Sequence, residues 1–91
     1  MYMLVSFDIK FKTNREKIER VFECLGLRKI QNELYIGEMD NKEQNNLVEK
    51  INAIIKDYDS VLIMPICQNC YLKKETCGRE IKFQNDLYRV Y

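Results

Sequence analysis

Few residues of this chain could do chemistry, and none of them is a histidine. A catalytic triad that needs imidazole and a zinc site with a histidine ligand are therefore excluded. One carboxylate stands out, because Asp8 lies at the far end of the apolar run 2–9, which is typical of a buried strand. From spacing alone, Asp8 is either a turn or capping residue or a functional group held by a rigid element.

Three of the four cysteines lie close together in the sequence. Cys67 and Cys70 form a CxxC pair, and Cys77 follows them. A structural zinc ion needs four ligands, so Cys24 would have to approach this group to complete a site. The first nine residues lack the basic start of a secretory signal, which favours reduced thiols. We therefore expect free thiols in a turn, with a weak zinc or thiol cluster as the alternative, and we do not expect zinc as a cofactor.

The basic residues suggest a polyanion as partner. Residues 1–37 and 63–91 each carry a net charge of +2, whereas residues 38–62 carry −3. Several cations fall at the start of a predicted helix, where backbone N–H groups favour anions such as nucleic-acid phosphates. An ordinary solvated surface is the alternative. The candidate nucleic-acid-binding residues are Lys10, Lys12, Arg15, Lys17, Arg28 and Lys29.

A helix is predicted directly after the first strand. Thr13 and Glu16 have the spacing of a capping box, and Gly26 supplies a C-terminal stop. Between them, apolar residues recur at the spacing of one helix face. These residues are Ile18, Val21, Phe22 and Leu25.

The middle of the chain predicts two further strands and a second helix. Apolar and polar residues alternate with period two over residues 27–39, with Ile30, Leu34 and Ile36 on one face and Tyr35 on the other. The polar pair at 31–32 predicts a bend or bulge that divides this segment into two strands. Asp40 and Glu43 form a second box-like start. The helix that follows is expected to end near Asp57 and to bury Leu47, Ile51, Ile54 and Ile55.

The last core segment is a strand over residues 60–67, where Pro65 marks a strand end or an edge. The order of elements is that of an α+β, ferredoxin-like βαββαβ domain with helices on one face of an antiparallel sheet. We assign residues 1–78 to this domain and residues 79–91 to a C-terminal strand or tail, which is placed to pair with the partner subunit's sheet. Ninety-one residues make one small domain, for which a homodimer is a reasonable expectation. No apolar run is long enough to span a membrane, and we expect a cytoplasmic protein without a membrane partner.

An ordered set of segments resembles one known family, the CRISPR-associated protein 2 family, over about residues 1–78. No single motif is specific to the family, and the spacing of the whole set carries the resemblance. The segments are Ser6-Phe7-Asp8-Ile9, the basic helix from about Arg15, the run 26–35, the run 37–40, and Ser60-Val61 leading into Pro65-Ile66-Cys67.

The resemblance implies a homodimer that works in CRISPR adaptation, the acquisition of new spacers. In that role the dimer bridges two CRISPR integrase dimers and holds the double-stranded prespacer DNA. It also implies a metal-dependent endonuclease that acts on RNA or double-stranded DNA, in which the first-strand aspartates of both subunits hold Mg²⁺ or Mn²⁺. Asp8 matches that position, so the resemblance makes it the catalytic residue and the metal ligand. Arg15, Lys17 and Lys29 match basic positions, and Tyr35 matches an aromatic one.

The chain also departs from the family pattern. Lys10, Phe11 and Lys12 stand where a small polar residue and further acids are common, and Glu33 stands where a serine is usual. These changes touch the region implied to be catalytic. The alternatives are therefore a non-catalytic nucleic-acid-binding scaffold dimer, or a ferredoxin-like module that binds another partner.

Overall fold

Strand β1 (Tyr2–Asp8) alternates buried and more exposed side chains, with Met3, Val5 and Phe7 buried. The structure is a computed structural model that describes residues 1–83. In it, β1 is an inner strand of a four-stranded antiparallel sheet. The strand order is β2-β3-β1-β4, the order of the ferredoxin-like split βαβ unit. The predicted α+β fold is therefore confirmed. The other strands are β2 (Arg28–Gln31), β3 (Leu34–Glu38) and β4 (Ser60–Ile66).

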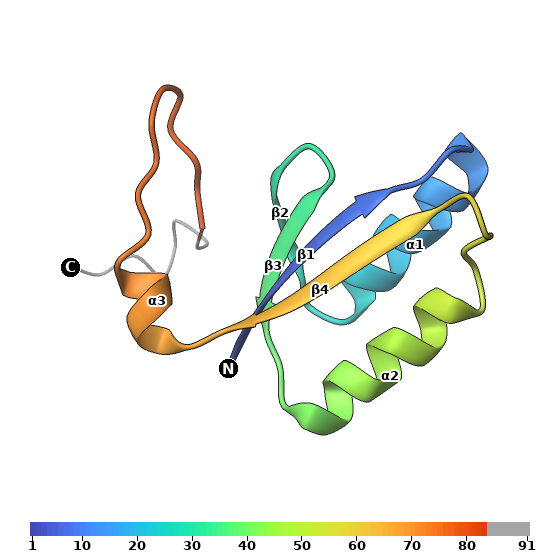
Figure 1. Ribbon diagram of the computed structural model, residues 1–91, viewed down its shortest axis with the longest axis horizontal. Helices are drawn as coiled ribbons and strands as arrows, with labels where there is room; N and C mark the ends of the chain where they lie inside the picture. Colours follow the sequence, from blue (N-terminus) through green and yellow to red (C-terminus); the bar gives the residue numbers. More distant parts are fainter. Residues whose placement is uncertain (84–91) are drawn as a thin grey trace.

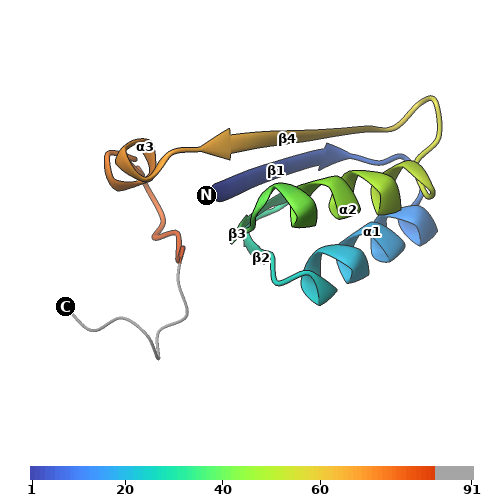
Figure 2. The ribbon, with the colours of Figure 1, turned by 90° about the horizontal axis from the view of Figure 1, so that it is seen from below.

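Two helices, α1 (Lys12–Cys24) and α2 (Asn41–Asn52), cover the same face of the sheet (Figures 1 and 2). Each helix has one apolar stripe, as the spacing predicted, and each stripe packs against the core side of β1. The core-packed residues of α1 are Ile18, Val21 and Phe22, with Leu25 just after the helix, and those of α2 are Leu47 and Ile51, with Ile54 and Ile55 in the loop that follows.

The two predicted capping boxes have different outcomes. The box at α2 is confirmed, because the Asp40 carboxylate accepts from the Glu43 backbone N–H at 2.8 Å and the Glu43 carboxylate accepts from the Asp40 N–H at 3.1 Å. The box at Thr13 is wrong. Helix α1 begins at Lys12 with Phe11 as its N-cap, two residues before the predicted cap, and no side chain caps the helix. The Phe11 carbonyl already accepts from Arg15 N–H at 3.0 Å, so Thr13 lies inside the first turn.

The ends of the helices also differ in how well the sequence predicted them. Gly26 follows α1 with φ +86°, as expected for a residue that stops a helix in the left-handed region. Helix α2 ends at Asn52, earlier than the predicted end near Asp57. Residues 53–59 instead form a loop that leads into β4, which is an edge strand as Pro65 indicated.

The predicted division of residues 27–39 is confirmed, and the break between β2 and β3 is a turn at residues 32–33. Glu33 adopts a positive φ of 62° there, and its carbonyl accepts from Phe7 N–H at 3.1 Å. Tyr35 lies on the face opposite Ile36, as predicted. That face is the one the helices cover, and the tyrosine is therefore buried with 3% of its surface exposed.

A short helix after β4, α3 (Gln68–Leu72), was not predicted, because five residues carry no measurable helical period. The ring of Tyr71 stacks on Tyr2 with centroids 4.0 Å apart, which holds α3 beside the start of β1. Residues 79–83 of the predicted tail form no strand in the structure, and the β-prone segment 87–91 lies outside the described residues. Within residues 1–83, no helix has the length and apolar character needed to cross a membrane.

The face of the sheet opposite α1 and α2 is rich in apolar residues but carries no helix layer (Figure 2). Leu62 and Met64 on β4 are 56% and 48% exposed there. Residues 70–83 border part of this face and leave a hollow of about 500 Å³ against it. We call it the uncovered sheet face; its apolar residues are Leu4, Leu34, Ile36, Leu62, Met64 and Ile66.

The contrast between the two boxes gives a direct test of the helix starts. Replacing Asp40 with alanine should lower the free energy of unfolding by about 1 kcal/mol, because an N-cap hydrogen bond is lost. The matched change Thr13→Ala should alter it by less than about 0.5 kcal/mol, because Thr13 caps nothing. Urea unfolding at one protein concentration measures both. An equal loss in the two variants would contradict the observed start of α1.

Candidate functional site

Asp8 is the last residue of β1 and is exposed at the end of the sheet. Its backbone pairs with Ser60, the first residue of β4. Because side chains alternate along a strand and Phe7 is buried under the helices, Asp8 lies on the side of the uncovered sheet face. The carboxylate that the sequence singled out is thus presented by a buried strand on the face that has no helix layer.

An aromatic cluster fixes this end of β1. The ring of Phe7 meets Phe22 of α1 at 5.7 Å in an edge-to-face arrangement and lies 6.1 Å from Tyr35 of β3. Phe22 and Tyr35 also meet each other edge to face at 5.0 Å. All three rings are buried, so the residue that precedes Asp8 is held from two sides.

Asp59 anchors the segment that follows Asp8. Its carboxylate accepts from Lys10 N–H at 2.9 Å and from Lys56 N–H at 3.0 Å. One side chain therefore joins the exit of β1 to the loop before β4. Sequence reasoning did not find this residue, because its partner Lys10 is 49 positions away and no local pattern reports such a contact.

Four of the six candidate basic residues lie around the start of α1, but they do not share one surface. Lys10 and Lys12 are exposed beside the end of β1. The Arg15 guanidinium donates to the Ile9 carbonyl at 3.4 Å, so it is partly used in holding the backbone. Lys17 lines a hollow of about 310 Å³ between α1 and α2, whose apolar floor is rimmed by Lys17, Arg20 and Lys50.

Arg28 and Lys29 lie on β2, at the opposite edge of the sheet from β4. They line a hollow of about 510 Å³ together with Glu19, Glu23 and Tyr35. Burial, followed by the nearby charges of Glu19 and Glu23, raises the pKa of Tyr35 to about 12. The two glutamates offset the positive charge of Arg28 and Lys29, so this is a mixed surface and not an extension of the basic region at α1.

The cysteines do not gather into a metal site within residues 1–83, where no group of three or more potential ligands could hold an ion. All four are free and exposed. The Cys67 sulfur accepts from Cys70 N–H at 3.4 Å, and this hydrogen bond is the main reason that the pKa of Cys67 is lowered. The pKa of Cys70 is raised by its own hydrogen bond to Cys67. The pair therefore holds one thiol that ionises more readily than the other.

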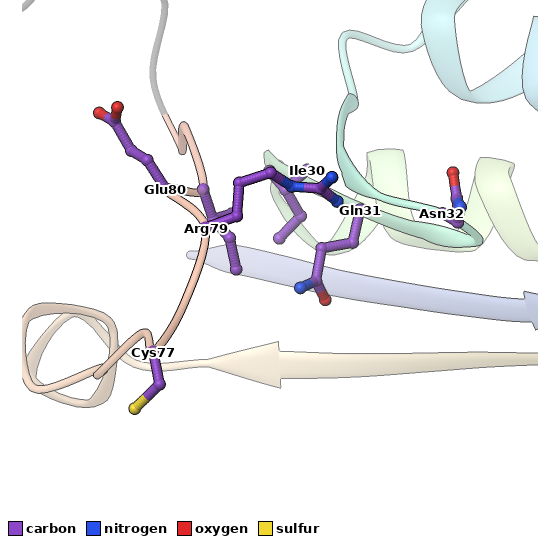
Figure 3. Close-up of a pocket in the computed structure, with 7 residues that line it drawn as sticks. Ile30, Gln31, Asn32, Cys77, Arg79 and Glu80 are labelled. Atoms are coloured by element: carbon purple, nitrogen blue, oxygen red, sulfur yellow. The ribbon is translucent and has the colours of Figure 1, made fainter.

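Another hollow, of about 510 Å³, lies between the β2–β3 turn and the segment after α3. Arg79 extends toward Ile30 and Gln31, whereas Glu80 points away (Figure 3). Arg79 is a cation that the sequence reasoning did not include. Arg79 is far from residues 30–32 in the sequence, and only the folded chain brings it beside the β2–β3 turn.

The fold and the strand-end carboxylate define a small ferredoxin-like protein with a helix layer on one side and an apolar sheet face on the other. The CRISPR associated protein Cas2 family matches residues 1–74, which is most of the chain. The chain therefore belongs to the Cas2 family, and the resemblance seen in the sequence is confirmed. It is a CRISPR-associated protein.

Individual relatives support the same assignment. A protein of Korarchaeum cryptofilum called CRISPR-associated endoribonuclease Cas2 is 31% identical over 78 residues, covering 85% of this chain and 84% of the relative. One of Archaeoglobus fulgidus called CRISPR-associated endoribonuclease Cas2 1 is 28% identical over 71 residues, covering 77% and 76%. Both alignments include most of each protein.

Solved structures agree with the fold. A structure described as Cas2 superposes with a TM-score of 0.75 at 25% identity and covers 88% of each chain. Cas2 of Streptococcus pyogenes superposes with a TM-score of 0.70 at 22% identity, covering 86% of this chain and all of that one. The second likeness concerns the fold alone.

The environment of Tyr35 predicts a dependence of stability on pH. Below pH 10 the phenol is neutral in both states, whereas between pH 10 and about 12 the unfolded chain releases the proton and the folded chain keeps it. Stability should therefore fall across this range, and the fall should be shallower in Tyr35→Phe. Urea unfolding at a series of pH values measures the slope. Glu19→Gln should also make it shallower, since Glu19 raises this pKa; slopes that match the wild type in both variants would contradict the assignment.

Proposed function

We propose that this protein is a homodimeric, metal-dependent endonuclease of the CRISPR system, in which the Asp8 carboxylates of two subunits share a divalent ion. The observation that carries the proposal is the position of Asp8, exposed at the end of a buried strand on the side of the uncovered sheet face. The names of the relatives from Korarchaeum cryptofilum and Archaeoglobus fulgidus support RNA as the substrate.

The dimer follows from the exposed apolar surface. Leu62 and Met64 stand on an edge strand without a helix over them, and such a surface favours association with another copy. A two-fold contact through this face doubles every residue on it, including Asp8. It would also bring the segments after α3 of the two subunits near the interface, where the predicted tail strand could extend the partner's sheet.

The residues present fit Mg²⁺ or Mn²⁺ only in such a pair. Mg²⁺ is commonly held by one or two carboxylates together with water and substrate phosphates. Among residues 1–83, Asp8 is the carboxylate that the end of β1 offers, whereas two chains offer two. A bound ion supplies charge stabilisation at phosphorus and an acidic water. The protein's contribution is to hold Asp8 on a rigid strand and to place Lys10 and Lys12 near the phosphates.

Asp8 gives the most direct test of the nuclease proposal. Replacing it with alanine or asparagine should lower Mg²⁺-dependent cleavage of single-stranded RNA by about 100-fold or more, because the metal ligand is lost. Asp57→Ala is the matched control, since Asp57 is an exposed carboxylate in the loop before β4. Cleavage is followed on end-labelled RNA and on duplex DNA, with and without EDTA. Activity that survives in Asp8→Ala would refute the role proposed for this residue.

The second candidate function is the scaffold role in CRISPR adaptation, in which the dimer holds the prespacer duplex and bridges two integrase dimers. The exposed Lys10 and Lys12 favour it, because contacts from lysine to backbone phosphates bind any duplex regardless of sequence. The two roles separate in one variant: Asp8→Ala would lose cleavage but keep salt-sensitive binding of duplex DNA.

The uncovered sheet face gives an independent prediction. Leu62→Glu and Met64→Glu should convert the dimer into a monomer, because each places a charge in the proposed apolar contact. Val48→Glu on α2 is the control, since Val48 is an exposed apolar residue on the helix side, 37% exposed. Sedimentation equilibrium measures the mass. A dimer that withstands both changes on β4 would place the interface elsewhere, and a wild-type monomer would contradict the proposed dimer.

A further inference from the structure

Two aromatic rings remain exposed among residues 1–83, and they lie against each other. Phe11 is 51% exposed and Tyr58 is 54% exposed, whereas the other described aromatic side chains are buried or half-buried. Their rings meet edge to face with centroids 5.7 Å apart. Phe11 is the N-cap of α1 and Tyr58 lies in the loop before β4. Two segments that are distant in the sequence therefore bring two solvent-exposed rings into contact.

The backbone around this aromatic pair is held in place. The Asp59 carboxylate bonds the N–H of Lys10, next to Phe11, and the N–H of Lys56, two residues before Tyr58. Asp59 N–H in turn donates to the Lys56 carbonyl at 2.9 Å. The backbone that carries both rings is therefore held before any ligand arrives, which lowers the entropic cost of binding.

A cation accompanies the rings. The Lys10 ammonium lies 5.5 Å from the centroid of Phe11 and 5.4 Å from that of Tyr58. Lys10 is two residues beyond Asp8, so the pair stands beside the end of β1 where the proposed metal ligand is. Exposed aromatic rings with an adjacent lysine are the combination that binds single-stranded nucleic acid, in which bases stack on the rings and phosphates meet the cation.

We propose that Phe11 and Tyr58 form a stacking site for an unpaired nucleobase, with Lys10 at its phosphate. This inference rests on the proposed function, because it requires that the protein bind nucleic acid. It adds the element that would distinguish strand forms: bases within a duplex are already stacked on their neighbours, so the site selects single-stranded segments or the unpaired ends of a duplex. A nucleotide held there lies next to Asp8, and stacking imposes no choice of base.

The experiment measures binding without cleavage, in EDTA, by fluorescence anisotropy of a labelled single-stranded RNA. Tyr58→Ala should weaken binding about tenfold, in line with the cost of losing one stacking partner. Tyr58→Phe, which keeps the ring, should bind as the wild type does. Val48→Ala removes a comparable exposed apolar side chain on α2 and should have no effect. Thermal unfolding and sedimentation of each variant confirm that the fold and the oligomeric state are retained.

Two further ligands separate the contribution of base stacking to the affinity from that of the phosphates. A strand with abasic sites keeps its phosphates, so wild type and Tyr58→Ala should bind it with the same, weaker affinity. A blunt duplex should bind equally to both proteins. Asp59→Ala, which removes the hydrogen bonds to the N–H groups of Lys10 and Lys56, should weaken binding of the intact single strand more than binding of the duplex.

Several results would overturn the inference. Equal affinity of wild type and Tyr58→Ala for the intact single strand would remove the stacking site, while duplex binding and Asp8-dependent cleavage would leave the proposed function standing. A wild-type protein that binds neither strand form would also overturn the inference, whereas the nuclease proposal is decided separately by Asp8-dependent cleavage in Mg²⁺. Conversion of Tyr58→Ala to a monomer would assign these rings to the contact between two copies instead.

Discussion

The burial of Phe7 between Phe22 and Tyr35 is the constraint on which the candidate site depends. Edge-to-face contacts at 5.7 Å and 5.0 Å link the three rings of β1, α1 and β3 into one cluster. Since neighbouring residues of a strand point to opposite faces, fixing Phe7 in the core also fixes Asp8 on the other side. Loss of this packing would let the end of β1 rotate or slip, and the carboxylate would lose its direction.

The same alternation creates the unbalanced sheet. Its inner face is covered by α1 and α2, whereas its outer face keeps Leu62 and Met64 about half exposed. A small domain gains much of its stability from each additional apolar surface that it buries. Pairing through the outer face would therefore stabilise the fold and bring two Asp8 residues to one site, so that one contact serves both stability and the proposed chemistry.

Local sequence patterns predicted most helices and strands, but they failed where contacts between distant residues determine the structure. Asp40 caps α2 as its spacing to Glu43 indicated, because that box involves only neighbouring residues. Thr13 has the same pattern but caps nothing, since the chain turns from β1 into α1 within three residues and the helix starts at Lys12. The apolar run 2–9 placed Asp8 correctly at a strand end. The clamp of Asp59 on Lys10 and the contact of Phe11 with Tyr58 join residues nearly fifty positions apart, and no periodicity reports them.

In the proposed dimer, two copies of Asp8 make one metal site. Titration with Mn²⁺, followed by electron paramagnetic resonance of the free ion, measures this directly on the purified protein. We expect one bound ion for every two chains, lost in Asp8→Ala and retained in the matched variant Asp57→Ala. Binding of one ion to each chain, or binding that Asp8→Ala leaves unchanged, would contradict it.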